Sequence, residues 1–109
     1  MPGYALIPNL QIHQPIPEDG ILTRQLLDDE RVRLVLFTFS PGQRLSEHTS
    51  STLAFLHFLS GEATVTLGKD SVEVGPGAWV RMDPGLAHSI MTKSKVVMLL
   101  TLIKGSPAK

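Results

Sequence analysis

The chain has 109 residues, of which 42% are hydrophobic and 18% charged, a composition typical of one globular domain and unlike a disordered chain. Ten lysines and arginines balance ten acidic residues, so no net charge favours nucleic acid or an anionic membrane as a partner. There is no cysteine, which excludes disulfides, thiolate metal sites and cysteine nucleophiles and agrees with a reducing compartment. The N-terminus also lacks the pattern of a signal peptide, so we expect a cytoplasmic protein. No apolar run approaches the ~20 residues of a membrane-spanning helix.

The first 20 residues contain four of the eight prolines. Proline fixes φ and has no amide hydrogen, so we predict a proline-rich edge segment over residues 1–20. Residues 4–7 and 10–13 are expected as short edge strands, with His13 at the surface. A single domain is predicted over residues 21–104, and residues 105–109 are expected to form a loose tail.

Strand signals then recur every 7 to 12 residues, separated by turns rich in glycine, proline and aspartate. We predict strands over residues 21–27, 31–39, 44–48, 53–60, 62–67, 71–74, 78–82, 88–91 and 95–103. With no amphipathic helix, this spacing favours an all-β sandwich or barrel. Residues 31–39 and 95–103 are apolar on both faces, which predicts packing on both sides and hence a homodimer.

The first stretch with candidate functional residues is residues 42–61. Gly42 is followed by five residues and then His48, and Gly61 closes the stretch after an apolar run that contains His57. The stretch is typical of two short strands joined by a polar corner.

A second stretch, residues 77–90, repeats this arrangement with a glycine, a short apolar run, a Pro-Gly turn and His88. Histidines on separate hairpins meet only if the hairpins fold over one another. His48 and His88 are therefore the first candidates for a shared site.

The spacing of both stretches resembles the two motifs of the cupin family, over roughly residues 30–103. The resemblance implies a jelly-roll (cupin) β-barrel, a double-stranded β-helix of two antiparallel sheets. In metal-binding cupins, three histidines and a glutamate project into the barrel. By alignment His48 and His88 occupy two of those four positions, which makes them the predicted metal ligands.

Several positions depart from the family pattern. Ser50 stands at a histidine position and Ala54 at the glutamate position, while Asp83 and Thr92 replace a proline and an asparagine of the second motif. Serine is a poor ligand for a borderline metal, and alanine is none. The resemblance therefore leaves either no cofactor or a weakly bound divalent metal such as Zn, Ni, Mn or Fe.

Strand alternation predicts which side chains face the barrel interior. If Ala54 points inward, Leu56 and Phe58 do too and His57 points outward. Only a bulge or a twist would make His57 an extra metal ligand. We predict a ligand pocket lined by His48, Ser50, Ala54, Leu56, Phe58 and His88.

Three residues near the second motif have weaker assignments. Trp79 is expected in the core. Arg81 lies on the same strand face, and it fits a functional residue and a solvated surface charge equally well. Asp83 lies in a turn at the barrel rim, where it either caps an amide or reaches a ligand.

Three functions remain open. The first is a small-molecule-binding cupin whose pocket holds an organic ligand with an apolar body and one acid or hydroxyl group. The second is a metal-dependent enzyme of the dioxygenase, isomerase or decarboxylase type. A two-histidine, one-carboxylate oxygenase needs a carboxylate in the same cavity, and none is evident, so the first function is preferred. The third is a purely structural dimeric module.

Overall fold

The computed structural model describes residues 3–12, 15 and 17–104, so the expectations for His13 and for residues 105–109 lie outside the described residues. Its elements are a short 3₁₀ helix, η1, and nine strands. These are η1 Leu10–Ile12, β1 Ile21–Asp28, β2 Val32–Phe39, β3 Arg44–His48, β4 Leu53–Ser60, β5 Ala63–Leu67, β6 Asp70–Val74, β7 Trp79–Met82, β8 His88–Thr92 and β9 Val96–Ile103. The described residues contain no helix long and apolar enough to cross a membrane.

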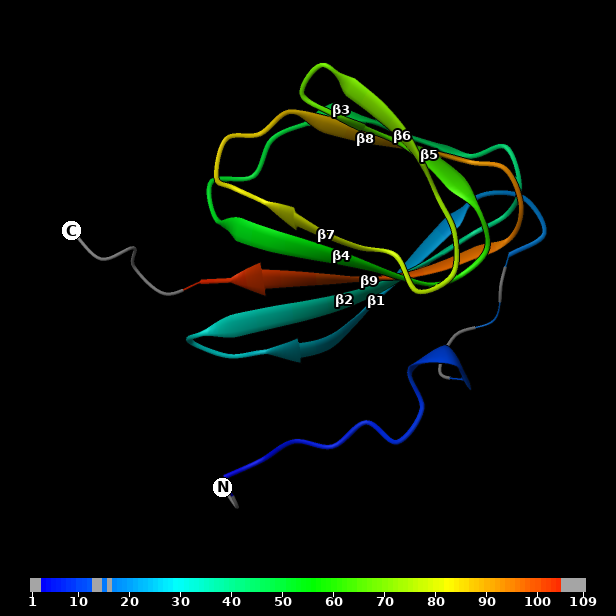
Figure 1. Ribbon diagram of the computed structural model, residues 1–109. Helices are drawn as coiled ribbons and strands as arrows, with labels where there is room; N and C mark the ends of the chain where they lie inside the picture. The colour runs from blue at the N-terminus through cyan, green and yellow to red at the C-terminus, as the bar shows by residue number, and fades with distance from the viewer. Residues whose placement is uncertain (1–2, 13–14, 16, 105–109) are drawn as a thin grey trace.

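The strands form two antiparallel sheets, β1-β2-β9-β4-β7 and β3-β8-β5-β6, which face each other across the core (Figure 1). Every strand pair is antiparallel, and the neighbours in each sheet are mostly distant in sequence. This arrangement confirms the predicted all-β jelly roll.

Both sheets contribute side chains to a shared apolar core. Strand β4 shows the alternation most clearly, because Ala54, Leu56 and Phe58 are at most 2% exposed while the residues between them are half-buried. The opposite sheet meets them with buried side chains of its own. The buried core consists of Phe39, Ala54, Leu56, Phe58, Ala63, Val65, Met82, Ile90, Val96 and Met98.

The described part of the N-terminal segment, residues 3–12, 15 and 17–20, differs from the edge strands expected there. Residues 4–7 form no strand, and residues 10–12 form η1, where the side chain of Asn9 accepts a hydrogen bond from the Gln11 amide at 2.9 Å. Pro8, between the two expected strands, has no amide hydrogen to donate to a ladder, and no described residue before β1 is part of the sheet. Figure 1 shows it running beside β1 and β2 as an arm, fastened where Thr38 Oγ1 donates to Pro15 O at 3.2 Å.

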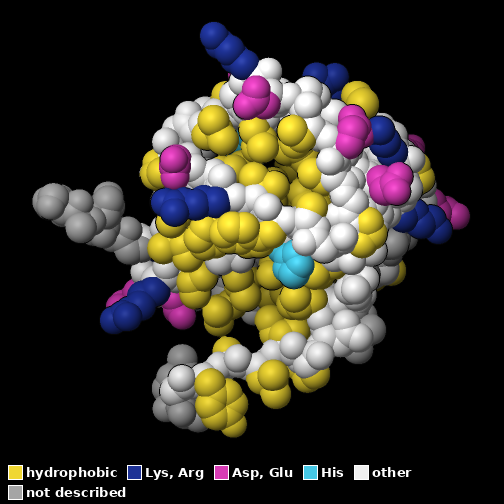
Figure 2. All heavy atoms as spheres, in the orientation of Figure 1, with side chains coloured by type: hydrophobic (Ala, Val, Ile, Leu, Met, Phe, Trp, Pro, Cys, Tyr) yellow, Lys and Arg dark blue, Asp and Glu magenta, His cyan; other side chains and the backbone are white. Residues whose placement is uncertain are grey.

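The outer face of the five-stranded sheet carries the tryptophan that was expected in the core. Trp79 is 60% exposed and stacks on Phe55, with ring centroids 5.1 Å apart. The expectation was wrong because Met82, which is 2% exposed, takes the inward position on β7 and alternation turns Trp79 outward with Arg81. Figure 2 shows hydrophobic side chains gathered over β7, β4, β9 and β2 on this face.

Candidate functional site

The two histidines singled out by their spacing are direct cross-strand partners. His48 ends β3 and His88 begins β8, and their Cα atoms are paired in the ladder. Their ring centroids lie 4.2 Å apart with an interplanar angle of 63°, and the two Nε2 atoms are 3.0 Å apart. His88 is only 5% exposed, whereas His48 is exposed at the rim. The structure thus brings together one buried and one accessible imidazole.

A β-bulge in β3 places His48 opposite His88. Leu45 pairs with Ile90 and His48 pairs with His88, so three steps along β3 match two along β8. Strict alternation would put Leu45 and His48 on opposite faces of the sheet. With the bulge, both lie opposite inward-facing residues of β8, since Ile90 is 1% exposed. Nothing in the residue types at Ser46 and Glu47 predicts this bulge.

Hydrogen bonds near both ends of β3 hold the two histidine-bearing stretches together. At the histidine end, the Gly85 amide donates to Ser50 O at 2.8 Å, which ties the β7–β8 turn to the β3–β4 corner. At the other end, the Gly42 amide donates to Thr92 O at 2.9 Å. The buried Thr92 hydroxyl donates to Ser40 O at 2.8 Å and accepts from the Gln43 amide at 2.9 Å. Thr92 therefore anchors the end of β8 in place of an asparagine.

The hydrogen bonds at Nδ1 determine where the ring hydrogens lie. His48 Nδ1 is 2.9 Å from Ser46 O, and His88 Nδ1 is 3.0 Å from Leu86 O. A carbonyl oxygen only accepts, so both Nδ1 atoms carry hydrogen. Two neutral rings would then face each other with bare Nε2 lone pairs. A hydrogen on one of the two Nε2 atoms would make this contact an N–H···N hydrogen bond.

The other predicted pocket residues lie in two different places. Ala54, Leu56 and Phe58 face inward and are packed in the core. Ser50 is half-buried in the β3–β4 corner, where its Oγ accepts from the Thr52 amide at 3.2 Å and lies 3.1 Å from Thr52 Oγ1. The Ser50 hydroxyl therefore makes its hydrogen bonds within the β3–β4 corner.

His57 and Asp83 lie outside the imidazole pair. His57 is half-buried and pairs with Trp79 across the β4–β7 ladder, on the outer face of the five-stranded sheet. Asp83 forms an exposed ion pair with Arg81, with Oδ1 3.3 Å from Nε. The structure therefore places neither residue in contact with the pair.

The residues around the pair do not fit a resident metal ion. Zinc sites in proteins use three or four protein ligands. Among the described residues, no three histidine, aspartate or glutamate side chains are grouped closely enough to hold an ion. Ala54 has no donor atom, and the Ser50 hydroxyl is engaged with Thr52. Two imidazoles supply only part of a coordination shell.

Comparisons with a family model and with solved structures agree on one protein family. A family model described as a cupin domain matches residues 35–103, more than half of the chain. A conserved protein of unknown function from Streptococcus pyogenes is similar in structure, with 26% identity and a TM-score of 0.84, over 94% of this chain and 90% of that one.

Two further solved structures have the same architecture. A cupin superfamily protein from Desulfitobacterium hafniense is 25% identical, with a TM-score of 0.77 over 93% of this chain and all of that one. A Thermus thermophilus protein at 20% identity, with a TM-score of 0.79 over 89% and 95% of the two chains, shares the fold. Comparison with curated proteins finds no match. The chain belongs to the cupin-domain family.

Proposed function

We propose that this protein binds a small organic anion whose carboxylate is held by His48 and His88 at the rim of the barrel. The observation that carries the proposal is the convergence of the two Nε2 atoms, 3.0 Å apart, with both Nδ1 atoms committed to backbone carbonyls. When both rings are protonated, such a pair offers two N–H donors that converge on one point. Charge-assisted hydrogen bonds of this kind are about twice as strong as neutral ones.

Access and apolar surroundings support the same proposal. A ligand reaches the pair from the side of His48, which is exposed, while His88 is held behind it. Leu45, Leu67 and Leu86 are partly buried near the two histidines, and Leu67 pairs directly with His88. An apolar body attached to the carboxylate would pack against these leucines. Small-molecule sites commonly combine such apolar walls with a few converging polar groups.

The proposal predicts a proton-linked affinity. To donate from both Nε2 atoms to one carboxylate, both imidazoles must carry a proton on Nε2. Imidazoles exchange protons between pH 5 and 8, so binding should tighten from pH 8 to pH 6. Losing one hydrogen bond to a charged group costs about 1.5–3 kcal/mol, so His48→Ala should weaken binding roughly tenfold to a hundredfold.

Calorimetric titration with benzoate and hexanoate at pH 6 and pH 8 tests this prediction. His57→Ala is the matched control, because it removes an imidazole from the outer face. His88→Gln is a second variant that keeps a polar side chain at the buried position. Binding that survives in both His48→Ala and His88→Gln, or that depends equally on His57, would refute the proposal. So would affinity that disappears when the protein is treated with a chelator.

A cytoplasmic location, expected for a chain without cysteine, and a homodimer are parts of the same proposal. We expect a second copy of the chain to pack against the outer face of the five-stranded sheet, because this face is apolar. Strands β4 and β9 contain no charged residue, and Trp79 is 60% exposed on this face. At ~4.8 Å between strands and ~3.3 Å per residue, β7, β4, β9 and β2 span roughly 400–500 Å². The part of this face over Leu36 and Thr38 is already buried within one chain.

The N-terminal arm adds to this surface. Tyr4 and Leu6 are more than 70% exposed, and a space of about 700 Å³ separates the arm from Leu27 and the β1–β2 turn. A standard interface buries ~800 Å² per partner, so a stable dimer would use both the arm and the sheet face. Both surfaces are apolar, so one copy can cover the other by a twofold axis.

Light scattering at micromolar concentration should therefore give twice the chain mass of 11.9 kDa. Trp79→Glu, which would bury a charge in the interface, should reduce the mass to that of one chain. Val72→Glu serves as the control, since Val72 is 38% exposed on the other sheet. A wild-type monomer, or a Trp79→Glu variant that stays dimeric, contradicts this arrangement.

A further inference from the structure

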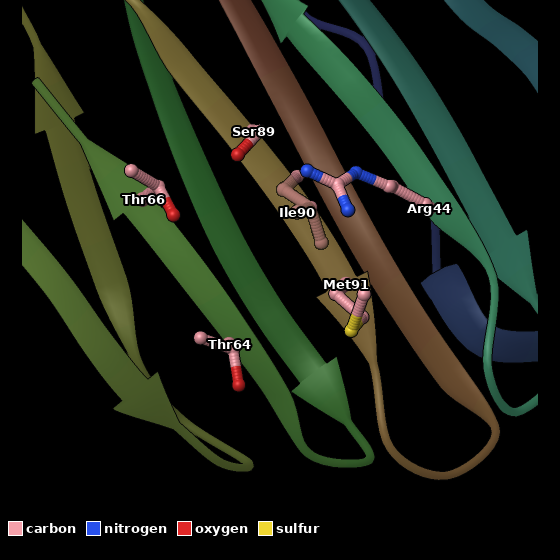
Figure 3. Close-up of a pocket in the computed structure, with 6 residues that line it drawn as sticks. All are labelled: Arg44, Thr64, Thr66, Ser89, Ile90 and Met91. Carbon is pink, nitrogen blue, oxygen red and sulfur yellow. The ribbon is translucent and has the colours of Figure 1, made fainter.

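The outer face of the four-stranded sheet carries a second polar site, on the opposite side of β8 from the histidine pair. Alternation turns His88 and Ile90 inward and Ser89 and Met91 outward. A shallow depression of about 150 Å³ lies over this outer surface (Figure 3). Its lining residues are Arg44, Thr64, Thr66, Ser89, Ile90 and Met91.

Three hydrogen-bond donors in this depression have no partner in the described part of the chain. Ser89 and Thr66 are cross-strand partners, so their hydroxyls stand side by side on β8 and β5. Neither hydroxyl makes a hydrogen bond to the described residues, and Arg44 makes no ion pair with them. Figure 3 shows the Arg44 side chain extending from β3 toward β8, with its guanidinium beside Ile90 and on the side of Ser89. A guanidinium and two hydroxyls thus share one hollow.

Glu73, an acidic residue across the ladder from Thr64, is already neutralised. Glu73 pairs with Thr64 across the β5–β6 ladder and accepts hydrogen bonds from its hydroxyl, at 2.9 and 3.1 Å. Glu73 also forms an ion pair with Lys93. The Lys93 ammonium, and then the Thr64 hydroxyl, lower the pKa of the Glu73 carboxyl, which therefore stays ionised and paired. Among the residues that line the depression, Arg44 is charged and none is acidic.

We infer that this depression binds a phosphate group, either inorganic phosphate or a phosphomonoester. An arginine fork matches two oxygens of a phosphate, and Ser89 and Thr66 can donate to a third. A water occupies about 30 Å³ in the liquid, so the space holds roughly five waters, enough for one phosphate group. Met91, which is 44% exposed, offers an apolar contact for the organic part of an ester.

Two-dimensional amide NMR with added inorganic phosphate at pH 7 tests the inference. The amides of Arg44, Thr66 and Ser89 should shift together, with one saturable binding constant. Arg44→Gln should weaken binding at least tenfold, and Arg44→Lys should restore only part of it, because lysine lacks the fork. Thr66→Val removes the hydroxyl with little change of shape and should weaken binding severalfold.

Arg81→Gln is the matched control, since it removes an exposed strand arginine from the other sheet. It should leave phosphate binding unchanged. Equal weakening by Arg81→Gln and Arg44→Gln, or shifts that do not saturate, would show only screening by a dissolved anion and would overturn the inference. Acetate should bind at least several times more weakly than phosphate, and equal affinity also overturns it. Carboxylate binding at His48 and His88 is tested by different variants, so either site can fail alone.

Discussion

Replacing Gly61 by alanine is expected to destabilise the fold by more than about 3 kcal/mol, through backbone strain and a direct clash. Gly61 has φ of +86°, a conformation that side chains rarely adopt. A Cβ at this position would overlap the carbonyl oxygen of Lys95 and lie 2.7 Å from Val96 Cγ2. Both belong to the chain entering β9, a central strand of its sheet, so the backbone there has little freedom to move. In a domain of this size, the melting temperature should fall by roughly 10–20 °C.

The Gly42→Ala variant measures the cost of backbone strain without the cost of a steric clash. Gly42 has a similar φ of +77°, but a Cβ there would have no atom within 4 Å. The cost should then be that of strain alone, about 1–2 kcal/mol. Denaturant unfolding of both variants at one protein concentration measures the difference. If Gly61→Ala costs no more than Gly42→Ala, the close approach to Lys95 is not a stability determinant.

The strands were predictable because their alternation and their turns agree. A strand was predicted over residues 88–91, and β8 spans His88–Thr92. Another was predicted over residues 31–39, and β2 spans Val32–Phe39. Glycine, proline and aspartate mark the ends, since they supply the special turn conformations. The arm was not predictable in the same way. An apolar, proline-rich segment has the composition of an edge strand, but whether it pairs depends on the neighbouring edge and not on its own residues.

The histidine pair was predictable from motif spacing, but its geometry was not. The bulge that brings His48 opposite His88 lies at Ser46 and Glu47, which include neither glycine nor proline. Trp79 shows a related limit. Alternation established that Trp79 and Arg81 share a face, yet which face is buried depended on how Met82 packs against the opposite sheet. The two-residue period of a strand shows which side chains share a face, but it does not show which of the two faces is buried.

Truncating Phe58 to alanine is expected to cost about 3–5 kcal/mol, the usual range for a fully buried phenylalanine. Phe58 is 0% exposed, and it belongs to a core cluster with Ile90 of the facing sheet. The sequence placed Phe58 on the wall of a ligand pocket, whereas the structure packs it on all sides. A residue lining an open pocket loses fewer contacts on truncation than one in a filled core, because solvent or ligand already covers one side. The size of the loss therefore distinguishes core from pocket.

Phe55→Ala is the internal control, because Phe55 lies on the same strand but faces outward, half-buried against Trp79. Its cost should be below about 2 kcal/mol, and it should vary with protein concentration if that face lies in a dimer interface. The cavity left in Phe58→Ala should be apolar and able to bind benzene, so benzene should raise the melting temperature of this variant and not that of the wild type. Equal stabilisation of the wild type would mean that the interior already holds an open space. The carboxylate bound at His48 and His88 would then have room to extend its apolar body inward past Phe58.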